Sequence, residues 1–307
     1  MKVAPEGESM NIGRNVPPIT VADFEPVIGG HRGVVAFKRA LGALTNVAAL
    51  LRTLGQFVQF NSVFGAGVAA LAGGLAARQD LFRDRDESVD ALADRSLDVA
   101  AGVFFAAIDE YGDPSRPGRC THRALAQATL RGFAEVAGQD GSSLARLLEP
   151  APATRTAITR VADGYGIGKA LSPMELLTAV GFHIGSELLA DREFGALDRF
   201  LRERHPELVA ALKARRVSIG AQSLPTYTWI SIHTTVEAEH RDAGIDAANR
   251  AVRYYAGSAG PSAARACILD GFESFCRVQQ EFLESLSSNV PASSIENEPI
   301  RGDLTCV

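Results

Sequence analysis

The sequence predicts an all-α protein, a helical bundle of about seven core helices. Ala, Leu and Arg are abundant, and all three are strong helix formers. Apolar residues recur at three- and four-residue steps through most of the chain, which is typical of amphipathic helices. The alternation expected of strands is absent, and the one β-branched patch, Trp229–Thr235, is short.

Three long helices are expected in the first half of the chain. The periodic run Gly33–Phe60 predicts the first. Ser88–Asp113 predicts the second, with Ser88 or Asp90 as its cap, and the motif GDPSRPG ends it with two prolines and two glycines. Cys120–Gly138 predicts the third.

Ser172–Arg204 is the clearest helix of the second half. Ser172 can cap it, Pro173 occupies the first helical position, and Glu175 lies at the capping-box position. A short helix is expected within the loop over residues 150–170. The remaining predicted helices cover residues 205–215, 224–257 and 261–287.

These helices are expected to form a single domain over residues 31–287. Residues 1–30 are predicted to be a flexible lead-in without the apolar core of a signal peptide, and residues 288–307 a flexible polar tail. The apolar run Phe57–Ala77 is about one bilayer long, but it contains Gln59, Asn61 and Ser62. We therefore expect a buried bundle helix rather than a membrane span.

Charge and cysteine content exclude some classes of protein. A net charge of −5 argues against a general nucleic-acid binder, which usually has a basic excess. The four cysteines are scattered and form no Cys-x-x-Cys pair, so we expect a reduced, cytoplasmic protein.

The motif HTTVEAEH places His233, Glu237 and His240 at offsets of 0, 4 and 7. On one helix, at about 100° per residue, they would share a wedge roughly 60° wide. Metal ligands need such convergence because metal–ligand bonds are only about 2 Å long. The alternative is a solvated polar face, but the preceding run TYTWISI is not surface-like, so His233 is expected to point inward.

Glu110 ends the apolar segment VFFAAIDEYGD, and Val103, Ala106 and Ala107 share its helix face. A carboxylate aimed at a core must be paired, protonated or metal-bound. The alternative is a helix-end acid that reaches solvent. His122 opens the next helix after the Pro/Gly turn, so two antiparallel helices would bring Glu110 and His122 to neighbouring levels.

His183 and Glu187 lie four residues apart in apolar surroundings. They are either a hydrogen-bonded core pair, or Glu187 is a metal ligand that His183 orients. The full set of candidate metal ligands is Glu110, His122, Glu187, His233, Glu237 and His240.

Three carboxylates and three imidazoles suit two octahedral first-row metals. Zinc fits less well, because the set has no cysteine and exceeds one tetrahedral site. Ferritin-like proteins use two Glu-x-x-His pairs, and this chain has only one, Glu237 with His240.

Over about residues 95–245 the chain resembles the haem-oxygenase-like di-iron oxidases and oxygenases. DEYGDPSRPGRCTHRAL, with Glu110 and His122, is similar to their E-Y-G…H signature, and HTTVEAEH is similar to their His-x-x-x-Asp-x-x-His helix. Glu187 would be the carboxylate that their intervening helix supplies. One departure is Glu237, where the family pattern has Asp.

The resemblance implies a haem-oxygenase-like bundle that binds no haem, holds two Fe ions and uses O2 as cosubstrate, through a peroxo-diiron(III) species. It implies an oxidoreductase of specialised metabolism, such as antibiotic biosynthesis, with a small-molecule substrate and an external electron donor. The subgroup that desaturates small aliphatic amino acids, or cyclises them to azetidines, is the expected one. Arg155, Arg160, Lys169 and Arg241 are candidates to bind the substrate's carboxylate. We expect no nucleic-acid or membrane partner. We expect a homodimer only because two-fold dimers are the commonest soluble oligomers.

Other interpretations remain open. N-oxygenation and C–C cleavage occur in the same family. A non-catalytic helical bundle would use the His and Glu residues structurally. A thiaminase-like hydrolase would need an activated cysteine, and no cysteine lies beside a suitable base in the sequence.

Overall fold

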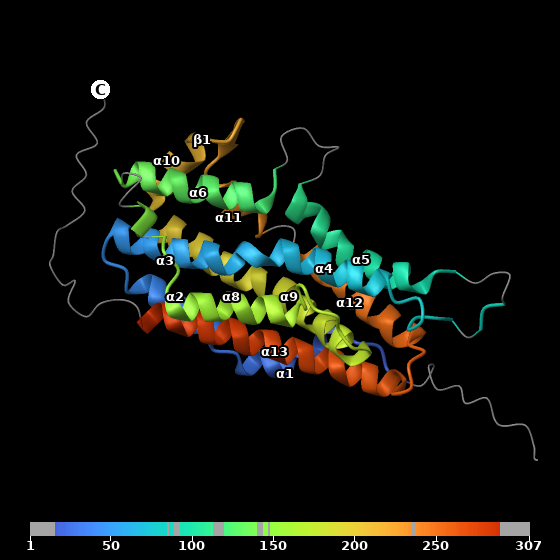
Figure 1. The fold of residues 1–307 in the computed structure, drawn as a ribbon. Coiled ribbons are helices and arrows are strands. Elements are labelled where there is room, and N and C mark those ends of the chain that lie inside the picture. Colours follow the sequence, from blue (N-terminus) through green and yellow to red (C-terminus); the bar gives the residue numbers. More distant parts are fainter. Residues whose placement is uncertain are drawn as a thin grey trace, which may run out of the picture.

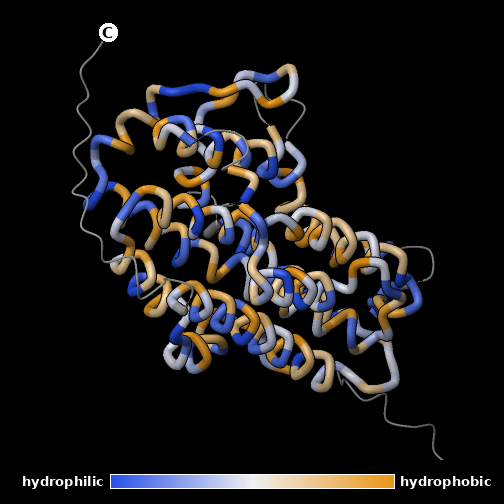
Figure 2. Tube along the Cα trace, turned by 60° about the vertical axis from the view of Figure 1, so that its left-hand side comes forward, coloured by the Kyte–Doolittle hydropathy of each residue, from blue (hydrophilic) through white to orange (hydrophobic). Residues whose placement is uncertain are grey.

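The predicted all-α helical bundle is confirmed by the computed structural model, in which helices pack side by side along an elongated body (Figure 1). The structure describes residues 16–84, 86–88, 93–112, 120–139, 144–146, 148–234 and 237–288. Hydrophobic and hydrophilic residues alternate along the helices, as amphipathic packing requires (Figure 2).

The elements of the first half are α1 (Val21–Gly30), α2 (Gly33–Gly42), α3 (Val47–Phe60), the 3-10 turn η1 (Asn61–Val63), α4 (Phe64–Ala76), α5 (Arg95–Tyr111) and α6 (His122–Val136). Those of the second half are α8 (Pro152–Gly164), α9 (Pro173–Arg204), α10 (Pro206–Ala214), β1 (Arg216–Ile219), β2 (Gln222–Pro225), α11 (Thr228–Ile232), α12 (Glu237–Tyr254) and α13 (Gly260–Ser288).

Helices α9 and α13 are the two longest and make the most extensive contact in the bundle. Glycines bring their backbones together: a Cβ added at Gly181 would lie 1.7 Å from the Ile268 carbonyl oxygen, and one at Gly271 would lie 1.9 Å from that of Thr178. Helices α2, α8 and α12 also pack on this pair, and α5 packs between α4 and α12.

The start of α9 is as predicted. The Ser172 amide donates to Glu175 Oε2 at 2.8 Å, the Glu175 amide donates to Ser172 Oγ at 3.4 Å, and Pro173 is the first helical residue. This capping box satisfies amides that would otherwise lack partners at the helix start.

Two helix starts in the first half differ from the prediction. Residues 33–60 form two helices rather than one, because the side chain of Asn46 accepts from the Ala49 amide at 2.8 Å and starts α3 afresh. Helix α5 begins at Arg95 rather than near Ser88, because Asp94 accepts from the amides of Ser96 and Leu97.

The predicted long helix over residues 224–257 was also wrong. A β-hairpin closes at Gly220, whose φ of 58° suits a tight turn, and pairs Ile219 with Gln222. Helix α11 then ends with His233 as its C-cap, and α12 begins only at Glu237. The β-branched run after His233, Thr-Thr-Val, has low helix propensity. The hairpin likewise corrects the expectation that the chain has no strands.

The expected lead-in does not extend to residue 30. Residues 21–30 form α1, whose Phe24 is buried and stacks on Phe272 of α13, with ring centroids 4.2 Å apart. The Thr20 amide donates to Asp23 at 2.8 Å and closes the start of α1. Residues 1–15 and 289–307, which hold the rest of the lead-in and most of the tail, lie outside the described residues.

One helical stretch among the described residues, Val47–Ala76, is long and apolar enough to cross a membrane. It includes most of the apolar run at residues 57–77, and 44% of its most apolar window is buried in the bundle. Leu50, Leu54, Phe57 and Phe60 of α3 belong to the core.

Candidate metal centre

Five of the six predicted ligands line one small cavity of about 30 Å³ at the centre of the bundle. They are Glu110, His122, Glu187, His233 and His240. Apolar side chains, including Phe64, Phe194 and Phe275, complete its walls. At about 30 Å³ per water molecule, this volume equals about one water, so the cavity suits metal ions but no larger molecule.

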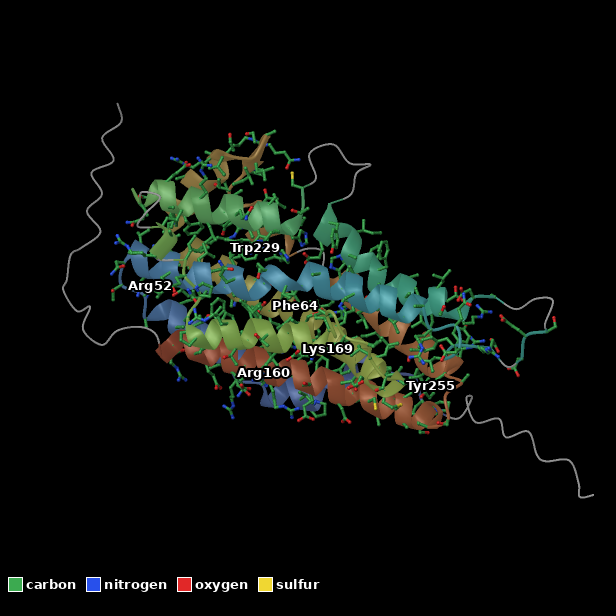
Figure 3. All side chains as sticks on the ribbon, viewed as in Figure 1. Arg52, Phe64, Arg160, Lys169, Trp229 and Tyr255 are labelled. Atoms are coloured by element: carbon green, nitrogen blue, oxygen red, sulfur yellow. The ribbon has the colours of Figure 1, made fainter. Side chains whose placement is uncertain are left out.

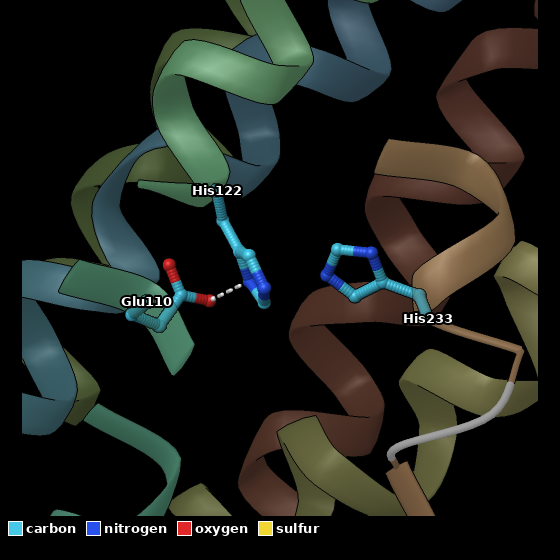
Figure 4. A group of neighbouring side chains, drawn as sticks. All are labelled: Glu110, His122 and His233. Atoms are coloured by element: carbon cyan, nitrogen blue, oxygen red, sulfur yellow. Dashed lines mark hydrogen bonds and ion pairs between the residues drawn. The ribbon is translucent and has the colours of Figure 1, made fainter. Parts of the chain in front are cut away.

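Glu110, His122 and His233 form the tightest group in this cavity (Figure 4). One ligand atom from each lies within 4.8 Å of the other two. Glu110 comes from the end of α5 and His122 from the start of α6, and Glu110 Oε1 is 3.2 Å from His122 Nδ1. The predicted approach of these two helix ends is therefore observed.

Gly65 on α4 has no side chain, which leaves room for the Glu110 carboxylate. A Cβ at this glycine would lie 3.1 Å from Glu110 Oε2, which is tighter than ordinary contact. The Glu110 side chain is 23% exposed and His122 only 7%. The carboxylate is thus held against α4 at the edge of the core, with Oε1 facing the imidazole of His122 and Oε2 facing Gly65.

The imidazole of His233 is held by a hydrogen bond to a backbone carbonyl one helical turn earlier and by stacking on an aromatic ring. Its Nδ1 lies 2.7 Å from the Trp229 carbonyl oxygen, so Nδ1 carries the proton and Nε2 the lone pair. Its ring stacks on Phe194, with centroids 4.0 Å apart and planes 8° from parallel. Burial and the neighbouring His122 lower the pKa of His233 to about 3, so the imidazole is neutral, as a metal ligand must be.

The two oxygens of the Glu187 carboxylate each lie close to one further imidazole, that of His183 or that of His240. Oε2 of Glu187 lies 3.3 Å from His240 Nδ1, and its Oε1 lies 3.3 Å from His183 Nδ1. His183 Nδ1 is also 3.3 Å from the hydroxyl of Tyr165. Burial lowers the pKa of His183, which is fully enclosed, so it is a neutral group that can orient Glu187.

Glu237, the sixth predicted ligand, cannot be placed with the others, because its side chain lies outside the described residues. The argument that put it on one helix face with His233 and His240 is wrong, since His233 is the C-cap of α11 and His240 belongs to α12. His233 and His240 nevertheless line the same cavity, from two helices that meet there.

Glu193 is a cavity residue that the sequence interpretation missed. Its side chain is buried, and its Oε2 accepts from Gln279 Nε2 at 2.7 Å. In the sequence, Glu193 lies in the charged run ADREF, which resembles a solvent-exposed helix face. Its burial was therefore not expected. Its spacing of seven residues from Ser186, another residue of the cavity, was the available signal.

The donor set fits iron. It offers imidazole nitrogens and carboxylate oxygens, none of the described cysteines lines the cavity, and the imidazole of His233 is held neutral. The buried carboxylates of Glu187 and Glu193 would offset the charge of divalent ions.

A second cavity of about 190 Å³ adjoins the first and shares Asn61, Glu110, His122 and His233 with it. Arg123, Ser62 and Trp229 also line it. Partial burial lowers the pKa of the Arg123 guanidinium, which nevertheless remains charged at neutral pH.

None of the arginines or lysines proposed from the sequence for a substrate carboxylate lines either cavity. Arg160 pairs with Glu281, Lys169 with Asp163 and Arg241 with Asp242, and Arg155 donates to the Pro150 carbonyl. Arg160 and Lys169 lie along the α8 side of the bundle, away from Trp229 (Figure 3). That expectation is therefore corrected.

The cysteines give no support to a thiaminase-like hydrolase. Burial raises the pKa of the Cys276 thiol to about 12, which is the opposite of activation. Among the described cysteines, none lines either of the two central cavities.

Comparison with solved structures supports the fold. The chain is similar to a CADD-like protein of unknown function from Nostoc punctiforme PCC 73102, with 12% identity and a TM-score of 0.55 over 91% of this chain and 96% of that one. A second crystal structure with the same description gives 15% identity and a TM-score of 0.52, over 84% and 87% of the two chains. No protein-family model matches the chain, and no curated protein matches it.

Proposed function

We propose that the protein is a non-haem di-iron enzyme that uses O2 to oxidise a small organic substrate. The observation that carries this proposal is the convergence of Glu110, His122, Glu187, His233 and His240 on one cavity. The sequence resemblance to the haem-oxygenase-like di-iron oxidases, which rests on the motifs that contain these residues, supports the same function.

When bound, the irons would supply the electrons that start O2 reduction. The protein's own groups would position and insulate them. Glu110, His122 and His233 would hold one iron, and Glu187 and His240 would contribute to the other, with Glu237 as the further ligand that the resemblance implies. Phe64, Phe194 and Phe275 would exclude bulk water.

For the reaction, we propose C–H oxidation of a small aliphatic amino acid, giving desaturation or closure to an azetidine. The support is the sequence resemblance. Desaturation yields fewer electrons than full reduction of O2 to water requires, so an external donor would supply the rest.

The test is to load the metal-free protein with Fe(II) under anaerobic conditions, remove excess metal and count the bound iron. About two irons per chain are expected, followed by a transient visible absorption on exposure to O2 with L-valine, L-leucine or L-isoleucine. His240→Ala should abolish O2 consumption while leaving helicity intact, and His205→Ala, outside the cavity, is the matched control. Fewer than about one iron per chain, with no transient absorption, would contradict the proposal.

A one-iron enzyme is the second candidate, because Glu110, His122 and His233 by themselves form a two-histidine, one-carboxylate set. It predicts about one iron per chain and insensitivity of iron content to Glu187→Gln. A non-catalytic bundle predicts no specific iron binding at all.

A further inference from the structure

The cavity of about 190 Å³ next to the metal centre is the natural place for a ligand. It is lined by the end of α3, η1, the start of α4, the end of α5, the start of α6 and α11, and Glu110, His122 and His233 line both cavities. A molecule held there would therefore reach the candidate ligands directly. At about 30 Å³ per water molecule, the volume equals roughly six waters, so it suits a small metabolite rather than a long chain.

One side of this cavity offers a cation and a hydrogen-bond donor. Arg123 lines it from the first turn of α6, and within the described part of the chain no carboxylate pairs with its guanidinium. The preceding Thr121 uses its oxygen to accept from the Ala124 amide at 3.1 Å, so its hydroxyl hydrogen remains to donate. Together these groups match a carboxylate.

Another side, formed by η1, offers acceptors. The Ser62 hydroxyl donates to the Gln59 carbonyl at 2.6 Å, which leaves the Ser62 oxygen to accept. Asn61 Nδ2 donates to the Phe57 carbonyl at 2.9 Å, which assigns the other amide atom, Oδ1, as a carbonyl oxygen. Both residues line the cavity, and among the described residues neither oxygen accepts from a donor, so the two acceptors match an ammonium group.

We propose that this cavity binds a small α-amino acid as its zwitterion, with the carboxylate held by Arg123 and Thr121 and the ammonium held by Asn61 and Ser62. Val58, Ala126 and the ring of Trp229 would contact an aliphatic side chain. The ligand's role as substrate rests on the proposed function, whereas its binding requires only the cavity.

Trp229 provides a direct measurement of binding. It is the single tryptophan of the chain and lines the cavity, so its fluorescence reports on a ligand without any need for turnover. L-leucine would be titrated into the metal-free protein and into the Zn(II)-loaded protein. 4-Methylpentanoate lacks the ammonium and isoamylamine lacks the carboxylate. Each is expected to bind about 10-fold or more weakly than L-leucine, since each leaves one set of partners unmatched.

Arg123→Gln should weaken L-leucine binding roughly 10- to 100-fold, the usual effect of losing a charge-assisted hydrogen bond. Isoamylamine binding should change little, which separates a lost carboxylate contact from a damaged fold. Arg52→Gln is the matched control, because Arg52 is exposed on α3 and lines neither cavity (Figure 3). Ser62→Ala should weaken L-leucine binding and leave 4-methylpentanoate binding unchanged.

The outcomes separate the two proposals. L-leucine binding without iron binding would support the cavity and contradict the di-iron function. Iron binding without L-leucine binding, in both metal-free and Zn(II)-loaded protein, would overturn the cavity assignment. Equal binding of L-leucine and 4-methylpentanoate, or an Arg123→Gln variant that behaves as Arg52→Gln does, would overturn it as well.

Discussion

Individual residues at this site are constrained by burial more than by their neighbours' charges. His183 and His233 both have pKa values below the usual range, and desolvation is the larger cause in each. Neutral imidazoles present lone pairs to a metal, whereas imidazolium ions would repel it. Burial therefore prepares these groups before any metal arrives, and it also makes the metal-free fold sensitive to acid.

The metal-free protein should lose stability as pH falls. The pKa of His233 is lowered from 6.5 to about 3 in the fold, so between these values the unfolded chain binds a proton that the folded chain does not. From pH 7 to pH 5 this one group should reduce the free energy of unfolding by roughly 2 kcal/mol. Urea unfolding of chelator-treated protein at both pH values measures it. In His233→Gln the free energy of unfolding should depend less on pH. If the pH dependence is unchanged, His233 is not the group responsible for it.

At the scale of elements, the sequence predicted helices wherever capping and apolar spacing agreed. Ser172 and Glu175 place the start of α9 correctly, and the predicted proximity of Glu110 and His122 is observed, with Oε1 and Nδ1 3.2 Å apart. The prediction failed where two helices follow each other without proline or glycine between them, as at Asn46 and at His233. Periodicity continues across such breaks, so it does not reveal them.

The candidate site was predictable only in part, because it is assembled from several elements. Side chains on one element can be related through helix geometry, but the meeting of α9 with α6, α11 and α12 depends on tertiary packing. Glu193 and Arg123 were missed because each stands beside charged or polar residues in the sequence and meets its cavity only in three dimensions.

The contact between α9 and α13 should depend on glycine at Gly181. Alanine there would place a Cβ 1.7 Å from a backbone oxygen of Ile268, and backbone cannot yield as a flexible side chain can. Gly181→Ala should lower the free energy of unfolding by about 1–3 kcal/mol or more. Gly195→Ala on the same helix meets nothing within 4 Å and should stabilise by about 0.5–1 kcal/mol. Chemical denaturation compares them, and equal effects would contradict the close-contact argument.

At the scale of the whole molecule, the candidate ligands come from α5, α6, α9, α11 and α12. A metal bound among them would connect segments from most of the chain. Because the unfolded chain does not preserve this arrangement, metal binding should stabilise the complete fold.

The melting temperature should therefore rise with metal concentration. Metal at about 100 times its dissociation constant adds roughly 2.7 kcal/mol. Anaerobic thermal unfolding with increasing Co(II), an oxidation-resistant substitute for Fe(II), provides the measurement. Co(II) should raise the melting temperature of His240→Ala less than that of the unmodified protein. It should raise the melting temperature of His205→Ala by the same amount as that of the unmodified protein. A melting temperature independent of Co(II) would count against any metal centre here.

The glycine contact between α9 and α13 has a mechanical consequence. Glu187 and Glu193 lie on α9, whose backbone touches α13, so a shift of this wall of the candidate metal site would also require the two longest described helices to repack. The larger cavity is lined instead by residues of α3, η1, α4, α5, α6 and α11. The carboxylates of α9 therefore lie on the bundle's most extensive helix contact, whereas the described elements that line the larger cavity lie outside that contact.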